Sequence, residues 1–295
     1  MSEKAYFIGA HAYSAPVIES ALYLVATPIG NLADITLRAL QVLAGVDILA
    51  CEDTRVTRIL LERYGIQKKT FLYHEHNAQK SGARLLAALA ENKTVALVSD
   101  AGTPLISDPG FKLVEQAREA GYKIVPIPGA SALLAALVAT GLPTDSFFFA
   151  GFLSARKSQR QKRLEQLKTI PATLIFYESP HRLIETLQDM ISIFSADRPA
   201  AICRELTKKF ETVNVSNLGT LFENYREQAH IRGEIVVLVG AGLPSLEVMS
   251  DQEIDEMLLD LARVHSAAKV AAMVAKKTGL KKQELFQRLT FLKDE

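Results

Sequence analysis

Short apolar runs that end in turn residues alternate with segments of helical periodicity over the first half of the chain. This alternation is typical of parallel β-strands joined by crossover helices. We therefore expect a doubly wound α/β domain over residues 21–143. The expected strands are Ala21–Ala26, Asp47–Cys51, Thr70–Tyr73, Thr94–Ser99 and Lys123–Ile127. The helices expected between and after them are Thr36–Leu43, Thr54–Tyr64, Ser81–Glu91, Phe111–Ala120 and Ser131–Thr140.

A turn-rich segment, Gly141–Ser146, separates this domain from a second apolar pattern. Residues 144–243 mix strand-like runs with helical periodicity, which predicts a smaller, mixed α/β domain. Its expected elements are strands at Thr173–Tyr177, Ala200–Arg204 and Glu234–Val239, a helix from His181 to about Ile191, and irregular or paired strands over Phe210–Gly219.

The two ends of the chain differ from both domains. Residues 1–20 mix charged and small residues without an apolar centre, so we expect a disordered extension there. Near the other end, an acidic helical segment precedes two helical stretches, Ser266–Lys277 and Lys281–Leu292, which are joined at a glycine. Residues 250–295 are therefore expected to form a basic helical tail of the helix-turn-helix type.

Composition narrows the class of protein. The chain has 295 residues, of which 48% are hydrophobic and 23% charged, so it has enough apolar material for two cores. No apolar run approaches the roughly 20 residues needed to cross a bilayer. Cys51 and Cys203 lie far apart in strand-like apolar runs, which favours buried free thiols in a reducing compartment. We therefore expect a cytoplasmic protein.

Basic residues are unevenly distributed, although the net charge is only +1. Residues 156–168 hold six Lys or Arg against one Glu, and residues 261–295 hold eight against three acids, so each stretch carries +5. Two basic patches of this size can contact a nucleic-acid backbone. The alternative is that these charges only solvate exposed helix faces.

Three Gly- and Pro-rich loops follow expected strands, at Thr27–Asn31, Asp100–Pro104 and Pro128–Ser131. Ligands of open α/β sheets bind beyond the carboxyl ends of the strands, and glycine lets the backbone approach a ligand closely. The loops match neither the dinucleotide-binding motif nor the P-loop, so we expect a ligand without a phosphate chain. S-adenosylmethionine meets this condition, and Asp100 can supply a carboxylate to it. The alternative is that these loops are only tight turns.

Six longer strings extend this pattern: Leu24–Thr36, Cys51–Arg55, Leu97–Pro104, Ser107–Gly110, Phe176–Arg182 and Arg204–Lys208. In this order they resemble the motifs of the ribosomal RNA small subunit methyltransferase I family, within the tetrapyrrole-methylase-like superfamily. The resemblance covers residues 21–240 and the basic tail. It implies a two-domain α/β fold of the tetrapyrrole-methylase type, which is not the Rossmann methyltransferase fold, with a small helical C-terminal extension.

The same resemblance implies an enzyme that uses S-adenosylmethionine to methylate the ribose 2'-hydroxyl of a cytidine in 16S ribosomal RNA, at the decoding centre. It also implies a homodimer that acts on the small ribosomal subunit, with the cofactor folded into the cleft between the domains. The cofactor contacts that it assigns are Pro28, Asp100, Gly102, Leu105, Ser131, Tyr177, Leu206 and Gly233.

Methyl transfer requires alignment of the acceptor oxygen with the methyl carbon, and a base that removes the proton assists it. Candidate bases are Glu178, Glu205 and Lys208, since a buried lysine with a lowered pKa can accept a proton. The alternative is a structural ion pair between Glu205 and either Arg182 or Lys208. The expected RNA contacts are Arg55, Arg58, Arg156, Lys157, Arg182, Lys276, Lys277, Lys281 and Lys282.

Other functions stay open on the sequence alone. An enzyme acting on a tetrapyrrole, or a diphthine-type enzyme acting on a protein, has the same fold and cofactor. A non-catalytic RNA-binding factor of ribosome assembly is a third possibility. No metal site is expected, because His74 and His76, if they alternate along an extended strand, supply only two ligands.

Overall fold

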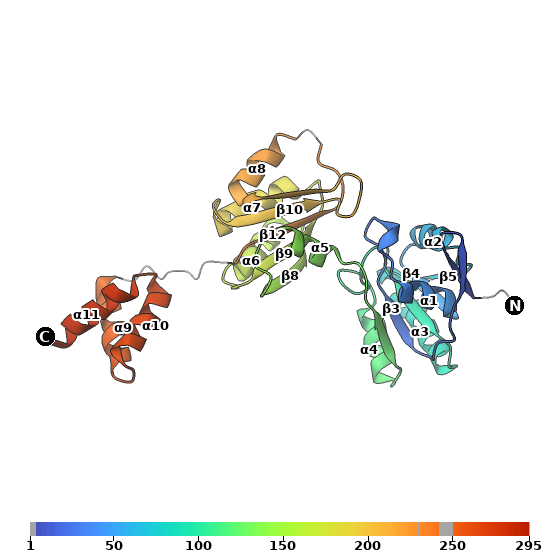
Figure 1. Ribbon diagram of the computed structural model, residues 1–295, viewed down its shortest axis with the longest axis horizontal. Helices are drawn as coiled ribbons and strands as arrows, with labels where there is room; N and C mark the ends of the chain where they lie inside the picture. The colour runs from blue at the N-terminus through green and yellow to red at the C-terminus, as the bar shows by residue number, and fades with distance from the viewer. Residues whose placement is uncertain (1–3, 229, 242–249, 295) are drawn as a thin grey trace.

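The computed structural model describes residues 4–228, 230–241 and 250–294, which form two sheet domains and a helical tail (Figure 1). The sheet of the first domain is parallel, with the strand order β5-β4-β6-β3-β7. Its strands are β3 (Leu22–Val25), β4 (Ile48–Cys51), β5 (Thr70–Leu72), β6 (Val95–Val98) and β7 (Ile124–Ile127). Its helices are α1 (Leu37–Gly45), α2 (Thr54–Arg63), α3 (Ala78–Ala90) and α4 (Phe111–Glu119), with short 3-10 helices η1 (Leu32–Asp34) and η2 (Glu75–Asn77). These elements confirm the predicted strands and the first four predicted helices.

Both faces of the first sheet are covered, which explains its continuous apolar strands. α1 and α2 pack on one face through Leu40, Leu43 and Leu60, and α3 and α4 pack on the other through Leu85 and Leu113. Every residue of β6, the central strand, is buried. The loops at the carboxyl ends of the strands therefore have a rigid base.

The N-terminus forms a hairpin of β1 (Ala5–Ile8) and β2 (His11–Ser14), so the disordered extension expected over residues 1–20 is wrong for this stretch. Tyr6 is buried in the core beside α1, and its ring stacks on Tyr13 at 5.5 Å. The Phe7 N–H donates to the Tyr64 carbonyl at 2.8 Å. The hairpin gains its order from these tertiary contacts, which composition could not indicate. Residues 1–3 lie outside the described residues.

The second domain has a mixed sheet with the order β11-β10-β12-β9-β8, in which β8 and β9 are parallel and the other pairs antiparallel. Helices α6, α7 and α8 share a core on one face of it. The strands are β8 (Phe147–Phe152), β9 (Thr173–Glu178), β10 (Pro199–Arg204), β11 (Thr212–Asn217) and β12 (Ile235–Val239). The helices are α6 (Lys157–Leu167), α7 (Leu183–Phe194) and α8 (Leu218–Arg226).

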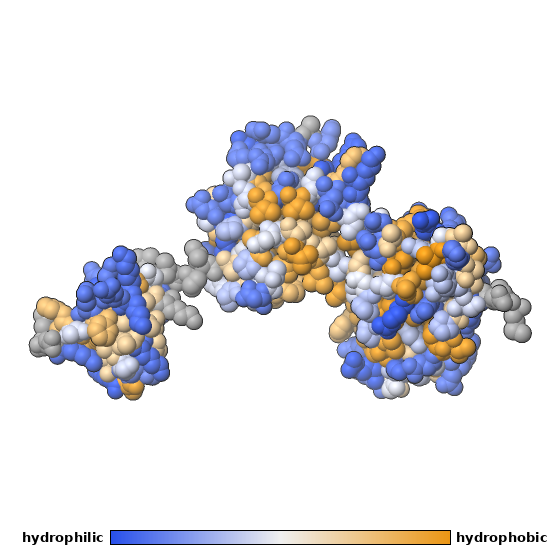
Figure 2. All heavy atoms as spheres, viewed as in Figure 1, coloured by the Kyte–Doolittle hydropathy of each residue, from blue (hydrophilic) through white to orange (hydrophobic). Residues whose placement is uncertain are grey.

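The other face of the second sheet is covered by α5 (Ala132–Ala139), the helix that the sequence placed in the first domain. Ala136 and Leu137 pack there against Ile175 and Leu238 of β9 and β12. The predicted place of this helix in the first domain is wrong. Because α5 is apolar all round, its sequence does not indicate which sheet it contacts. Figure 2 shows apolar residues gathered on this face of the second domain. The loop before α5 therefore lies between the two sheets.

The tail is a bundle of α9 (Asp251–Ala262), α10 (Ala267–Thr278) and α11 (Lys282–Asp294), with its own core around Leu258, Val270 and Leu289. The expected pair of helices joined at a glycine is confirmed, since α10 ends at Gly279 in the left-handed conformation. The acidic segment before them is a third helix of the bundle. Within the described residues, no helix is both long and apolar enough to span a membrane.

Candidate functional site

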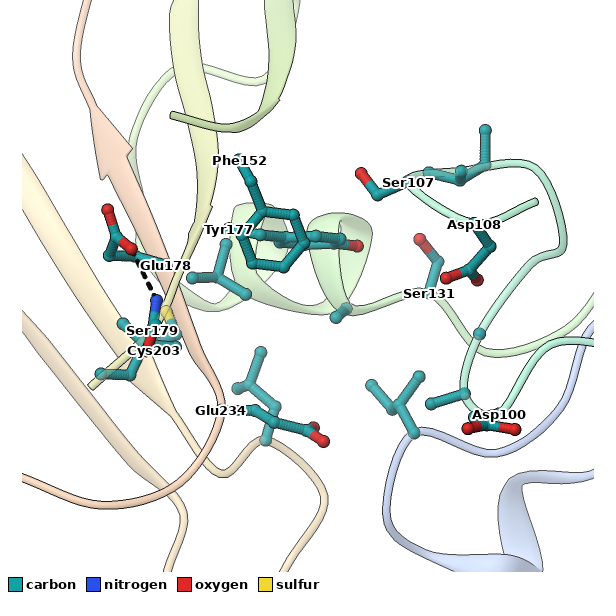
Figure 3. A pocket seen from close by; sticks show the side chains of 18 of the residues that line it. Asp100, Ser107, Asp108, Ser131, Phe152, Tyr177, Glu178, Ser179, Cys203 and Glu234 are labelled. Atoms are coloured by element: carbon teal, nitrogen blue, oxygen red, sulfur yellow. Dashed lines mark hydrogen bonds between the residues drawn. The ribbon is translucent and has the colours of Figure 1, made fainter. Parts of the chain in front are cut away.

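A cleft of about 460 Å³ lies between the two sheet domains (Figure 3). The first domain contributes the loops after β4, β6 and β7, and the second contributes the ends of β9, β10 and β12. The strand ends of the parallel sheet thus face the second domain, as the position of ligand sites in open α/β sheets predicts. Six of the eight expected cofactor contacts line this cleft, namely Asp100, Gly102, Ser131, Tyr177, Leu206 and Gly233.

The other two expected contacts lie outside the cleft. Pro28 lines a second, smaller pocket beside it. The Leu105 side chain packs on the core of the first domain, and its backbone has a left-handed φ of 73°. Leu105 therefore turns the loop that carries Ser107 and Asp108 to the cleft.

Every Asp, Glu, Lys, Arg or His among the described residues that line the cleft is an acid. Burial raises the pKa of Asp100, Asp108 and Glu52, and neighbouring carboxylates raise it further. Asp100 also accepts the Asp53 N–H at 2.9 Å, which fixes its carboxylate at the end of β6. A cleft with this charge attracts a cationic ligand and repels phosphate.

Sequence reasoning missed several lining residues, including Glu52, Asp108, Phe152 and Glu234. Glu52 could have been found, because it directly follows the buried strand β4, just as Asp100 comes two residues after β6. Asp108 lies ten residues beyond β6, and only the turn of its loop brings it to the cleft.

Aromatic and apolar side chains form the opposite wall. The Tyr177 ring meets those of Phe149 and Phe152 edge-on, at 4.8 and 5.5 Å between centroids. Cys203 also lines this wall, and burial raises the pKa of its thiol to about 12, so it stays protonated. Both cysteines are free and buried, as expected. This wall suits a flat or apolar part of a ligand rather than a charged one.

Lys208 lies between two carboxylates at the border of the domains. Its Nζ is 2.9 Å from Glu205 Oε1 and 3.1 Å from Glu234 Oε2, and its methylene chain covers Gly30 of the first domain. Burial acts to lower the pKa of Lys208, but the two carboxylates outweigh it and leave that pKa raised. The expected lysine with a lowered pKa is thus wrong, because the amine is paired. Lys208 is an ammonium, and its bond also lowers the pKa of Glu205.

The carboxylate of Glu178 is fully occupied. Its Oε1 accepts the Ser179 N–H at 2.7 Å and pairs with Arg182 at 2.7 Å, while its Oε2 accepts the Thr186 hydroxyl at 2.6 Å. The Glu178 side chain points away from the open centre of the cleft in Figure 3. Arg182 also donates to the Leu153 carbonyl at 3.1 Å. Glu178 and Arg182 therefore hold the start of α7, and neither is carried forward as a base or an RNA contact.

Most of the other expected RNA contacts are exposed. Arg55 and Arg58 project from the start of α2, each beside a carboxylate, Asp53 or Glu62. The remaining exposed contacts are Arg156, Lys157, Lys277, Lys281 and Lys282, whereas the Lys276 side chain lies outside the described residues.

One basic residue of the stretch 156–168 is not exposed. Arg160 is 2% exposed, and its Nε donates to Asp189 at 2.7 Å. The expected basic face is therefore smaller than the sequence indicated, because one of its charges is used to join α6 to α7.

Comparison with known proteins agrees with this architecture. The family model of tetrapyrrole (corrin/porphyrin) methylases matches residues 21–221, which assigns the two sheet domains to that class. The model of the RsmI C-terminal HTH domain matches residues 248–293.

Ribosomal RNA small subunit methyltransferase I of Mesorhizobium japonicum is 55% identical over 287 residues, which is 97% of either chain. The Vibrio cholerae relative of that name is 47% identical over 267 residues, covering 90% of this chain and 93% of the relative. The chain belongs to the ribosomal RNA small subunit methyltransferase I family.

Solved structures share the fold at low identity. The cobalt precorrin-4 methyltransferase superposes with a TM-score of 0.58 at 18% identity, covering 74% of this chain and 94% of that one. Uroporphyrin-III C-methyl transferase from Thermus thermophilus, complexed with S-adenyl homocysteine, gives 0.52 at 19%, covering 75% and 97%. Diphthine synthase gives 0.57 at 18%, covering 74% and 89%. These likenesses confirm the predicted fold class.

Proposed function

We propose that this protein transfers the methyl group of S-adenosylmethionine to the ribose 2'-hydroxyl of a cytidine in 16S ribosomal RNA, at the decoding centre. The observation that carries the proposal is the cleft itself, which joins an acidic side to an aromatic wall in a chain whose relatives are named ribosomal RNA methyltransferases. We further propose that it acts in the cytoplasm, as a homodimer, on the small ribosomal subunit.

S-adenosylmethionine fits the chemistry of the cleft. It carries a sulfonium and an ammonium against one carboxylate, so Asp100, Asp108 and Glu52 offset its positive charge. Its adenine suits the wall of Tyr177 and Leu206. Gly102, Ser131 and Gly233 are proposed to contact it through the loops that they form. When bound, the cofactor supplies the electrophilic methyl group.

The acceptor oxygen is proposed to approach from the side of Lys208. The Lys208 ammonium donates a hydrogen bond to this oxygen and offsets the negative charge that develops as its proton leaves. Glu205 keeps Lys208 charged and in place through the 2.9 Å bond. The released proton passes to the Glu234 carboxylate, which is largely exposed and exchanges it with water.

Exposed cations are proposed to position the RNA. Arg55 and Arg58 lie near the cleft, Arg156 and Lys157 lie on the second domain, and the tail adds Lys277, Lys281 and Lys282. Contacts of this kind fix the orientation of the RNA, while the cleft selects the atom that reacts.

The test is tritiated methyl transfer from S-adenosylmethionine to small ribosomal subunits that were prepared without this modification. Digestion to nucleosides should place the label in 2'-O-methylcytidine, and subunits that already carry the modification should take up none. If no label enters despite measured cofactor binding, the proposal fails, and a tetrapyrrole acceptor, a protein acceptor or a non-catalytic role takes its place.

A further inference from the structure

A second pocket, of about 240 Å³, opens between residues 27–32 and helix α2. It adjoins the cofactor cleft, because Ile29, Asp100, Ala101 and Glu234 line both. Lys208 lines this pocket and not the cleft. The ammonium therefore faces a ligand that lies beside the proposed cofactor rather than the cofactor itself.

The walls of this pocket combine apolar surface with nearby cations. Pro28, Val56 and Ile59 line it, and Val56 and Ile59 are 40% and 58% exposed although both are large and apolar. Arg55 and Arg58 stand beside them on α2, in exposed ion pairs that contribute little stability and are easily exchanged for other anions. Such a surface fits a flat ring whose neighbours are phosphates.

One polar group inside the pocket lacks a strong partner. Thr57 is buried, and the described residues offer its hydroxyl no hydrogen-bond partner other than the weakly polar Cys51 thiol. Buried hydroxyls are normally satisfied, so this one stands ready to bond a ligand. The pocket is smaller than the roughly 300–1,000 Å³ typical of ligand pockets, which suits a single base better than a macrocycle.

We infer that this pocket receives the nucleoside that is methylated, turned out of the RNA. Its base lies on Val56 and Ile59 and is bonded by the Thr57 hydroxyl. Its ribose lies at the shared border, where the 2'-hydroxyl meets Lys208 and faces the cofactor, and its flanking phosphates reach Arg55 and Arg58. The inference rests on the proposed function and names the part of the site that selects the acceptor.

Two variants test the pocket. Val56→Trp fills its mouth from an exposed position, and should lower kcat/KM for small ribosomal subunits by at least about 100-fold, a loss comparable to that of a transition-state contact. Thr57→Val removes one hydroxyl of nearly equal size, and should lower kcat/KM by about 3- to 10-fold, the worth of one neutral hydrogen bond. In both, the affinity for S-adenosylhomocysteine, measured by calorimetry, should stay within about twofold.

Leu37→Trp is the matched control, because Leu37 is exposed on α1 and lines neither pocket. It should leave both kcat/KM for subunits and the affinity for S-adenosylhomocysteine unchanged. A Val56→Trp enzyme that methylates subunits at the wild-type rate overturns the pocket while the proposed function stands. A Val56→Trp enzyme that loses cofactor affinity as well assigns the pocket to the cofactor and also overturns it. If the wild-type protein methylates no subunit, the proposed function fails and this inference falls with it.

Discussion

The two sheet domains use charged side chains in different ways. In the second domain most buried charges are paired, Arg160 with Asp189 at 2.7 Å and Glu178 with Arg182 at 2.7 Å. The buried Arg198 instead donates to the Gly240 carbonyl at 2.8 Å. In the first domain the carboxylates of Glu52, Asp100 and Asp108 face the cleft, and the described part of the chain provides none of them with an ion pair. Paired charges hold helices in place, whereas desolvated carboxylates without a cation are suited to bind one from outside.

The largest expected effect comes from breaking a pair in the second domain. Arg160→Met leaves the Asp189 carboxylate buried with Gln161 as its one remaining side-chain partner among the described residues, and should cost about 3 kcal/mol of unfolding free energy. Urea denaturation measures this loss. Lys162→Met, an exposed lysine of the same helix, is the control and should change stability by less than about 0.5 kcal/mol. Equal losses in the two variants would contradict a structural role for the Arg160 pair.

Lys208 is the cation proposed to contact the acceptor oxygen. Its removal should therefore lower turnover without changing the affinity for the cofactor. Lys208→Met should lower kcat by about 100-fold or more, because the developing charge on the acceptor oxygen loses its donor. Cofactor affinity by calorimetry should not change, since Lys208 does not line the cleft. The neighbouring Lys209→Met variant serves as control and should stay active; full activity of Lys208→Met would remove Lys208 from the mechanism.

Replacing an unpaired carboxylate of the first domain should have the opposite effect to replacing Arg160: ligand affinity should fall and stability should not. Asp100→Asn should weaken S-adenosylmethionine binding by about 10-fold, as the loss of a charge-assisted contact does, while thermal stability stays the same or rises. Stability is spared because burial already disfavours the Asp100 charge, as its raised pKa shows. Thermal unfolding with and without ligand measures both effects. A large loss of stability in the unliganded variant would show that Asp100 stabilises the fold, as the Arg160 pair is expected to do.

Acidic pH should mimic this substitution. The pKa values of Asp100, Asp108 and Glu52 are raised, so these groups take up protons at a higher pH than ordinary carboxyls. Protonation removes the negative charge that attracts the cofactor, and affinity for S-adenosylmethionine should therefore fall as pH is lowered towards these raised values. S-adenosylhomocysteine lacks the sulfonium charge and should show a smaller dependence. Identical pH profiles for the two ligands, measured by calorimetry, would exclude the charge explanation.

The smallest expected effect belongs to the exposed cations of α2. Replacing Arg55 and Arg58 together by Ala should raise KM for subunits by about 3- to 10-fold and make binding less dependent on salt concentration. Stability should change little, because both ion pairs are exposed. Steady-state kinetics at two salt concentrations measure the effect, and an unchanged salt dependence would show that these arginines do not contact phosphate.

Most strands of the two sheets were predictable because their signals are local, but β8 (Phe147–Phe152) was not predicted. Apolar runs such as Val95–Val98 end in turn residues, and each lies where the sequence placed it. Helix α6 was less visible, since most of its residues are charged or polar and only a few apolar ones, such as Leu164 and Leu167, join the core. The packing of α5 was not predictable, because a helix that is apolar all round can cover either sheet.

The sequence by itself determined the order of the strands along the chain, the helical tail and the loops that line the cleft at Asp100, Gly102 and Ser131. Tertiary structure alone decided which charges are paired. Arg160 is buried beside Asp189 rather than exposed on the predicted basic face, and Glu178 is paired with Arg182. Lys208 is paired with Glu205 and with Glu234, which lies 26 residues further along the chain. The pKa of a side chain depends on neighbours within a few ångströms, and folding brings those neighbours from distant parts of the sequence.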